Sequence, residues 1–253
     1  MIKNIRLIMV IIKNIPKINL RYLPLLKKNK NNTKKVNTMI YENIFILTSC
    51  VNTNENNSIF INHNPNHTPE IRLSETINGL KSIRKHYKDA KIIFIESSKL
   101  NSIQKRRIDL YVDDFFDYSN SKVIRIARKH YNKGVPQFTA LVKFVEENYN
   151  KYNCKTLHFL GARYLINKKE ADKYSNQGSY MKFSCKDFNS STRYFFFKNI
   201  SLKSLISPFR KTLYLSILGI SVEDILFRFL PNFKKIKLLA ISGIVNGIEP
   251  ITE

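Results

Sequence analysis

The sequence has no tryptophan and only three cysteines among its 253 residues. The cysteines, Cys50, Cys154 and Cys185, show no C-x-x-C spacing, which argues against a disulfide framework and a cysteine-rich zinc site and indicates a reducing compartment. Long apolar runs are also lacking, because the apolar segments at 7–12 and 212–222 are shorter than the roughly 20 residues that cross a bilayer. We therefore expect a cytoplasmic protein without a transmembrane segment.

Acidic side chains are scarce: 19 Asp and Glu stand against 43 Lys and Arg, which leaves a net charge of +24 and a pI near 9.9. Such a charge predicts an anionic partner, and nucleic acid, a nucleotide phosphate and a lipid head group are the candidates. Lysine, asparagine and isoleucine are plentiful, as in proteins from AT-rich genomes. Part of the positive charge therefore reflects coding bias rather than binding.

The first 38 residues hold 10 of the 43 basic residues and none of the 19 acidic ones. Three interpretations stay open for this segment: a basic surface-binding extension, an organelle-type leader, or a disordered tail that includes sequence upstream of a true start at Met39. We expect a basic, disordered extension at 1–38 and a folded domain at 39–253.

From Met39 onward, short apolar runs alternate with helical patterns. The run "NIFILTSC" at 43–50 is typical of a buried strand, and Thr68-Pro69-Glu70 is a strong helix start, with a cap residue, proline at the first position and an acid in the first turn. A helix is expected over 69–87, and a second buried strand over 90–98. A further helix follows Pro136, and "TLHFL" at 156–160 is the next strand. This alternation predicts a parallel sheet.

The second half has a different pattern. "YMKFSCKDF" and "TRYFFFKN" are expected to be adjacent, antiparallel strands, the two segments at 201–219 and 221–230 are expected to be helices, and "IKLLAISGIVNG" is expected to be a last strand. The predicted fold class is α/β, with a mostly parallel central sheet flanked by helices in a single domain.

In open α/β sheets, ligands bind beyond the carboxyl ends of the strands. Arg163 follows such an end directly, where its planar guanidinium could hold a diphosphate, while Tyr164 could stack on a base or a sugar. The alternative is that Arg163 pairs with a carboxylate such as Asp113 and Tyr164 packs in the core. The polar residues expected at or near this edge are Thr48, Ser49, Arg72, Thr76, Glu96, Ser97, Ser98, Arg163 and Tyr164.

The order of several short motifs resembles a GT-A-like glycosyltransferase family of bacterial surface-polysaccharide loci and large DNA viruses. The motifs are "ILTSC", "RLSETINGLKSIRKHYKDAKIIFIESS", "DDFFDY", "NKGVPQF", "FLGARYLIN", "ISVEDIL" and "SGIVNG", and together they span most of 43–247. The resemblance implies a GT-A-like fold and the transfer of a sugar from a nucleotide-diphosphate donor to a glycan or lipid-linked acceptor. It points to donor-binding roles for Arg72, Thr76, Glu96, Ser97, Lys133, Arg163 and Tyr164, and to Glu223 as a general base; Thr48 joins the donor-binding set by its position.

Two departures from the family pattern bear on activity. Gly161-Ala162 precedes Arg163 where Ser-Gly would be usual, and Pro136-Gln137 stands where Gly-Glu is expected. If that glutamate takes part in the chemistry, activity is in doubt. Glu223 itself has a plainer interpretation, since an acid in the first turn of a helix is stabilised by the helix dipole.

GT-A enzymes usually bind a divalent metal through a D-x-D motif, but "TLHFLGARY" contains no acid. The remaining acidic cluster, Asp113, Asp114 and Asp117, is also typical of a solvated loop. Stabilisation of the leaving group by Arg163 and Lys133 without a metal is the alternative, and Mn²⁺ or Mg²⁺ stays open as a cofactor.

The leading hypothesis is thus a glycosyltransferase of polysaccharide biosynthesis, peripheral to a membrane if its acceptor is lipid-linked. Two other functions stay open. The charge and the many Tyr and Phe residues suit a basic nucleic-acid-binding protein, although no recognised nucleic-acid-binding motif is visible. The departures suit an inactive GT-A-like protein retained for binding.

Overall fold

The computed structural model describes residues 39–52, 68–130, 132, 134–175, 178–184, 189–230, 234–236, 241–245 and 249–252, together with Tyr22, Pro24 and Leu25. Lys133 and Cys185 lie outside these residues. All statements below concern the described part of the chain.

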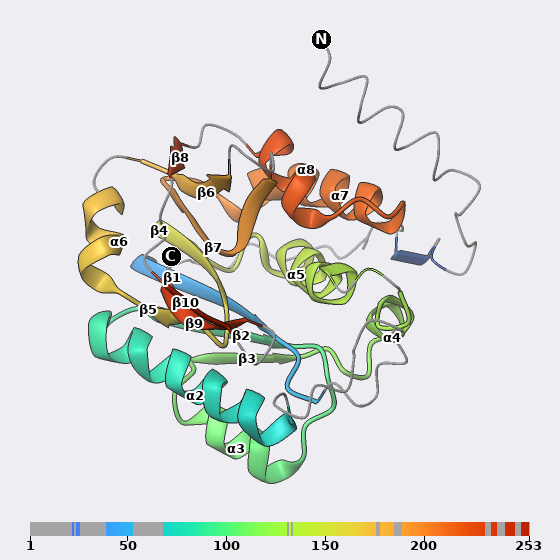
Figure 1. The fold of residues 1–253 in the computed structure, drawn as a ribbon, viewed down its shortest axis with the longest axis horizontal. Coiled ribbons are helices and arrows are strands. Elements are labelled where there is room, and N and C mark those ends of the chain that lie inside the picture. Colours follow the sequence, from blue (N-terminus) through green and yellow to red (C-terminus); the bar gives the residue numbers. More distant parts are fainter. Residues whose placement is uncertain are drawn as a thin grey trace.

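A seven-stranded sheet forms the centre of the molecule, in the order β3-β2-β1-β4-β7-β6-β8 (Figure 1). Strands β3, β2, β1 and β4 run parallel to their neighbours, β7 is antiparallel to both β4 and β6, and β8 is parallel to β6. The strands are β1 (Ile40–Ser49), β2 (Lys91–Glu96), β3 (Asp114–Asp117), β4 (Asn153–Gly161), β6 (Tyr180–Ser184), β7 (Asn189–Lys198) and β8 (Lys234–Ile236). The predicted mixed α/β fold, with a mostly parallel central sheet in one domain, is confirmed.

Helices cover both faces of the sheet (Figure 1). One face carries α2 and α3, and the other carries α5 and α7 with α4 and α8 beside them. The helices are α2 (Pro69–His86), α3 (Ser102–Asp109), α4 (Lys122–Ala127), α5 (Gly134–Asn148), α6 (Lys168–Ser175), α7 (Leu202–Ile217) and α8 (Val222–Phe229). None of the helices in the described ranges has the length and apolarity needed to span a bilayer.

Alternation along the strands divides the core into two layers. On β1, Ile44 and Ile46 point to the layer under α5 and α7, whereas Phe45 and Leu47 point to the layer under α2. All four side chains are fully or almost fully buried. Because both faces of the strand are covered, its apolar run is continuous rather than alternating, as the parallel-sheet prediction required.

The expected start of the first helix is confirmed. The Thr68 hydroxyl accepts a hydrogen bond from the Ile71 amide at 3.3 Å, and Pro69 occupies the first helical position. The last apolar segment differs from the prediction. Its strand is β9 (Ile241–Val245), which pairs with β5 (Leu165–Ile166) and β10 (Glu249–Thr252) in a second sheet and is therefore not the last strand; only its first residue, Ile236, belongs to β8.

Two residues of the basic N-terminal segment lie in the core. Tyr22 and Leu25 are 4% and 5% exposed. The Tyr22 hydroxyl donates to the Lys129 carbonyl at 2.9 Å, and its ring meets the His130 ring edge-on. The boundary between an extension at 1–38 and a domain at 39–253 stays a prediction, but the segment contributes buried side chains to the domain.

Removal of residues 1–38 is expected to leave a domain that still unfolds cooperatively, because the complete sheet begins at β1. Its free energy of unfolding should fall by about 3 kcal/mol or more, since two large side chains leave the core. Urea denaturation measures both properties. The double variant Tyr22→Ala/Leu25→Ala in the full chain should reproduce most of the loss, and a non-cooperative transition in the shortened chain would move the domain boundary toward the N-terminus.

A histidine lies inside the layer under α2. His158 on β4 stacks on Phe45 with the ring centroids 4.1 Å apart, and its ring nitrogens lie 2.9 Å from the Tyr194 hydroxyl and 3.0 Å from the Asn43 side-chain oxygen. Burial lowers the pKa of His158 to about 3, from 6.5. The imidazole is therefore neutral in the folded protein at neutral pH.

His158 should make the protein sensitive to acid. Between pH 6.5 and 3 the unfolded chain binds a proton that the folded chain does not, so stability is present above pH 6.5 and is lost as the pH falls through this window. The stability difference between wild type and His158→Gln should shift by about 2 kcal/mol against wild type between pH 7.5 and 5. Denaturation curves at both pH values measure it; parallel pH profiles would show that His158 does not titrate in this way.

Candidate functional site

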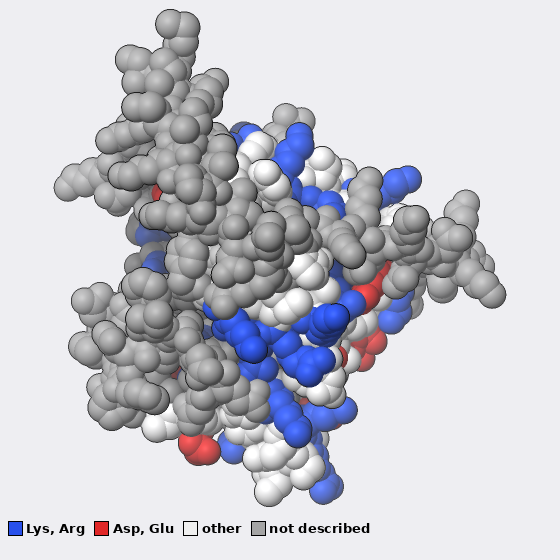
Figure 2. All heavy atoms as spheres, turned by 90° about the vertical axis from the view of Figure 1, so that its right-hand side faces the viewer, with Lys and Arg blue, Asp and Glu red and all other residues white. Residues whose placement is uncertain are grey.

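The carboxyl ends of β1, β2 and β4 meet at one edge of the sheet, which we call the carboxyl edge. Ser49 pairs with Glu96, and Thr48 pairs with Gly161, so the three strands end at the same level. The end of β1 lies toward the right of Figure 1, and Figure 2 shows that side of the molecule. Lys and Arg predominate over Asp and Glu in the described part of the surface seen there (Figure 2).

Glu96 joins the loops at this edge. Its side chain is fully buried, and one carboxyl oxygen accepts hydrogen bonds from the Val51, Ser97 and Ser98 amides and from the Ser98 hydroxyl, at 2.7 to 3.3 Å. Burial raises the pKa of the Glu96 carboxyl, against the hydrogen bonds from Ser98, which lower it. The carboxyl therefore fixes the turn after β2 to the loop after β1.

Ser97 lies beside Glu96 and is equally buried. Its hydroxyl donates to the Ser49 carbonyl at 2.8 Å. The predicted donor-binding residues Glu96 and Ser97 thus lie at the expected edge, and their described contacts are with the two loops.

Arg72 reaches the carboxyl edge from the first turns of α2. Its Nε donates to the Cys50 carbonyl at 2.9 Å, while its two terminal nitrogens donate to no group among the described residues. Burial and the nearby Arg163 charge lower the pKa of the Arg72 guanidinium. Two positive side chains therefore lie close together at the edge, an arrangement that favours an anion between or beside them.

Arg163 forms an ion pair, but not with the carboxylate named from the sequence. It donates to Glu75 on α2 at 3.0 Å, and the two side chains are 23% and 16% exposed. Asp113 instead pairs with Arg84 at 2.8 Å. The ion-pair interpretation of Arg163 is therefore correct in kind and wrong in partner. No local sequence pattern indicates Glu75, because the pair joins residues 88 positions apart.

A glycine on α2 allows the close approach that places these two arginines together. A Cβ at Gly79 would lie 2.3 Å from the Ala162 carbonyl oxygen and 3.0 Å from that of Tyr164. The backbone after β4 is thus pressed against α2 where no other residue fits. Gly161 has a similar role at the strand end, since a Cβ there would meet the Tyr164 ring at 2.9 Å. The Tyr164 ring lies over this glycine and is partly buried against the α2 layer.

Thr48 contacts a residue that the sequence marked only as a departure. The Gln137 amide, in the first turn of α5, donates to the Thr48 hydroxyl at 2.5 Å and to its carbonyl at 3.3 Å. Gln137 is exposed enough to reach a ligand at this edge and is held in place by Thr48. We did not identify it from the sequence as a site residue.

Glu223 lies on the other side of β4, in the first turn of α8. Its two carboxyl oxygens accept hydrogen bonds from the Thr192 hydroxyl at 3.0 Å and the Ser221 hydroxyl at 3.1 Å. Thr192 precedes Arg193 on β7, whose carbonyl would lie 3.7 Å from a Cβ at Gly161. These contacts bring Glu223 to the neighbourhood of the carboxyl edge.

Two further residues predicted to bind the donor, Thr76 and Lys133, have no described contact at the carboxyl edge. Thr76 is fully buried, and its hydroxyl oxygen has no hydrogen-bond partner among the described residues. Its side chain can support the placement of Arg72 one turn earlier, but it does not face solvent. Lys133 lies outside the described residues.

The acidic cluster near β3 does not fit a metal site. Asp113 accepts from the Ile92 amide at 2.6 Å besides its pair with Arg84, and Asp114 pairs with Lys91 at 3.1 Å and accepts from Tyr152. Within the described ranges, no three His, Cys, Asp or Glu side chains come together in a way that could hold a metal ion. Asp113 and Asp114 form ion pairs, and the exposed Asp117 accepts a hydrogen bond from the Ser119 amide, so we derive no step through a metal.

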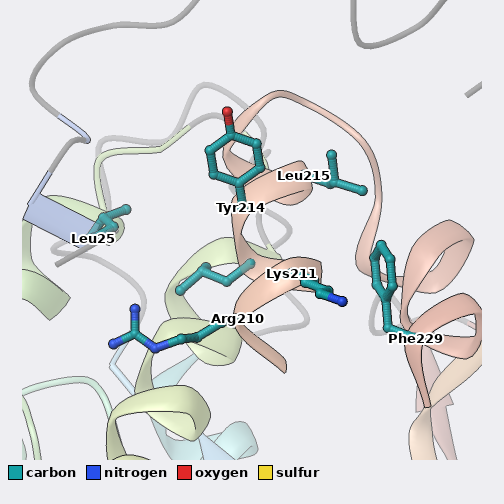
Figure 3. Close-up of a pocket in the computed structure, with 7 residues that line it drawn as sticks. Leu25, Arg210, Lys211, Tyr214, Leu215 and Phe229 are labelled. Atoms are coloured by element: carbon teal, nitrogen blue, oxygen red, sulfur yellow. The ribbon is translucent and has the colours of Figure 1, made fainter. Parts of the chain in front are cut away.

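A separate hollow lies between α7 and α8. It is an open groove with a volume of about 420 Å³, and Phe229 lies on its wall (Figure 3). Phe229 is the last residue of α8, whereas Glu223 lies in the first turn of this helix. None of the predicted site residues lines it. The lining residues are Leu25, Arg210, Lys211, Leu213, Tyr214, Leu215 and Phe229.

Comparisons with known proteins give distant structural likenesses. No family model and no curated protein matches the sequence. The galactosyltransferase LgtC, solved with donor and acceptor sugar analogues, is 9% identical, with a TM-score of 0.43 over 77% of this chain and 72% of its own. The bifunctional glycosyltransferase WbbM is 10% identical, with a TM-score of 0.45 over 83% of this chain and 40% of its own. The mannosyltransferase Ktr4p from S. cerevisiae, in complex with GDP, is 11% identical, with a TM-score of 0.37 over 84% and 71%. At this distance the likenesses say nothing about individual residues.

Replacement of Glu96 tests its role at the carboxyl edge. Glu96→Ala should lower the free energy of unfolding by about 3 kcal/mol or more, because several buried donors lose their acceptor. Glu96→Gln keeps one acceptor oxygen for these donors, so it should cost much less. Urea denaturation of both variants decides; equal losses would mean that the side chain acts through its volume and not through its hydrogen bonds.

Proposed function

We propose that the chain is a glycosyltransferase that takes a sugar from a nucleotide-diphosphate donor held at the carboxyl edge. The observation that carries the proposal is the convergence of Arg72 and Arg163 beyond the ends of parallel strands, with the terminal nitrogens of Arg72 unengaged among the described residues. A diphosphate is the anion that two forked guanidinium groups suit best, since each can hold two oxygens. The order of motifs described from the sequence supports the same class.

Glu75 gives the site a resting state. Its carboxylate accepts a hydrogen bond from Arg163 at 3.0 Å. A bound diphosphate would compete with Glu75 for Arg163, and Arg72 would add its charge. During transfer, negative charge grows on the leaving diphosphate, so the two arginines would stabilise the transition state more than the ground state.

Glu223 is the proposed general base for the acceptor hydroxyl. A base needs a fixed orientation and reach to the reacting proton. Thr192 and Ser221 supply the orientation by donating to the two carboxyl oxygens. Thr48, Ser97 and Tyr164 are proposed to shape the donor pocket. Glu96 is proposed to position the loops of this pocket, and Thr76 to position Arg72. Lys133 is proposed to contribute a further positive charge. The acceptor would be a glycan or a lipid-linked saccharide of polysaccharide biosynthesis, met in the cytoplasm.

One observation favours a second candidate, a protein that binds the donor without transferring it. Gln137 stands where the resembling family has a glutamate, and its amide donates to Thr48. An amide cannot serve as a base. The two candidates agree on donor binding and differ only in turnover, which a glycosyl-transfer assay measures.

A thermal-shift screen with UDP-, GDP-, CMP- and dTDP-sugars, with and without Mn²⁺, first identifies a donor. Variants of the two arginines then test the proposed site. Arg163→Ala and Arg72→Ala should each weaken donor binding by roughly ten- to a hundredfold, as expected for a charge-assisted bond of about 1.5–3 kcal/mol. Arg163→Lys should restore only part of the affinity, because lysine lacks the fork. Isothermal titration calorimetry measures the constants.

Arg84→Ala is the matched control, because it breaks another arginine–carboxylate pair on the same helix. It should leave donor affinity unchanged while lowering the melting temperature as much as Arg163→Ala does. If Arg163→Ala lowers the melting temperature and leaves donor affinity at the wild-type value, the pair with Glu75 is structural and the proposed site is wrong.

A further inference from the structure

The outer side of α3 carries two exposed arginines between two exposed aliphatic residues. Ile103 and Leu110 are 70% and 73% exposed, and Arg106 and Arg107 are exposed as well. Spacings of three, four and seven residues place all four side chains on one side of a helix. We call these residues the α3 stripe. The pattern reverses the ordinary one, in which the outward side of a surface helix is polar.

The α3 stripe stays exposed to solvent, because the opposite side of α3 is buried against the rest of the domain. Ile108 and Gln104 are the buried residues of the helix, and the Gln104 amide exchanges hydrogen bonds of 3.0 and 3.1 Å with the Asn52 side chain. Asn101 and Gln104 form a capping box at the helix start. Leu110 keeps a right-handed helical conformation at the C-cap, so its side chain stays in line with the helix. The four residues are therefore presented to solvent by a fixed support.

The surface beside the stripe is basic. Helix α2 packs against α3 on the same face of the sheet (Figure 1). Its outward positions include Lys81 and Lys85, and Lys105 on α3 is also exposed. The acids exposed nearby are fewer, with Asp109 on α3 and Asp89 after α2 as the neighbours in sequence. Positive charge thus surrounds the two aliphatic side chains.

We propose that the α3 stripe docks on the surface of an anionic membrane. The basic residues would lie among negatively charged head groups, each adding to the attraction, while Ile103 and Leu110 enter the boundary with the acyl chains. The two aliphatic residues are about 10 Å apart along the helix axis, so both reach a surface that lies parallel to α3. Each contribution alone is weak, and their combination gives reversible binding.

Lipid fits the stripe better than nucleic acid does. Nucleic-acid sites combine basic residues with aromatic side chains on which bases stack. The exposed apolar residues here are aliphatic, and the nearby Tyr111 ring is partly buried with Lys81 above it. Positive charge combined with aliphatic rather than aromatic side chains therefore points to a lipid surface, and nucleic acid becomes an outcome of the test.

Membrane docking does not depend on the proposed transfer reaction. The stripe lies on α3, outside the set of residues proposed to hold the donor, and it would act equally in a protein that only binds. Loss of donor binding and loss of membrane binding are therefore separate failures, measured by separate assays on separate variants.

Vesicle co-sedimentation of the full chain tests the proposal with phosphatidylcholine vesicles, with and without phosphatidylserine. The wild-type chain should bind the anionic vesicles, and Ile103→Ser/Leu110→Ser should weaken the binding by about tenfold or more, since two partly inserted side chains are lost. Arg106→Gln/Arg107→Gln should weaken it about five-fold for each arginine. All four residues are exposed, so the melting temperatures should match that of wild type.

Two matched controls separate the stripe from the general charge of the chain. Met39→Ser/Ile40→Ser removes two exposed apolar residues at the start of β1, and Lys203→Gln/Lys211→Gln removes two exposed charges from α7 on the opposite face. Both should bind vesicles like wild type. Equal loss in these controls, or no binding of wild type to anionic vesicles, overturns the proposal. Binding of a single-stranded oligonucleotide that depends on Arg106 and Arg107, without vesicle binding, would assign the stripe to nucleic acid.

Discussion

The buried carboxyl of Glu96 is the contact on which the carboxyl edge depends. The backbone N–H and C=O groups of a loop that follows a strand lack the hydrogen-bond partners that a neighbouring strand supplies. Two such loops must be held at fixed positions for a site to exist between them. Glu96 does this by accepting hydrogen bonds from both, including the Val51 amide. Val51 follows Cys50, whose carbonyl holds Arg72. One buried acid thus fixes, through the backbone, the position of an arginine on another element.

The arrangement of charge at the edge balances attraction and repulsion. Arg72 and Arg163 would repel each other strongly without a counter-charge, and Glu75 supplies one through its ion pair with Arg163. A carboxylate that neutralises one arginine and leaves the terminal nitrogens of the other available would be compatible with the proposed anion site. A structural ion pair and an anion site are in this way compatible uses of the same residues.

The close contact between α2 and the end of β4 is what brings this charge together. Gly79 lets the helix touch the Ala162 carbonyl, and any side chain there would move Arg163 away from Arg72. Membrane docking through α3 would place the same face of the sheet toward the lipid, since α2 and α3 lie side by side on it. The candidate site and the proposed docking surface therefore involve neighbouring helices on the same face of the sheet but have no residue in common.

The sequence by itself determined the elements and the strand ends. The continuous apolar runs before Thr48, Glu96 and Gly161 could come only from strands covered on both faces, and the Thr68 cap and Pro69 defined the start of α2, because these signals are local. Tertiary structure alone decided the partners. Glu75 for Arg163, Gln137 for Thr48 and Thr192 for Glu223 join residues 88, 89 and 31 positions apart, and no local pattern encodes such a contact. The pairing of β9 with β5 and β10 in a second sheet and the burial of Tyr22 have the same cause. Strand pairing and side-chain packing depend on the rest of the folded chain, and a single segment does not encode them.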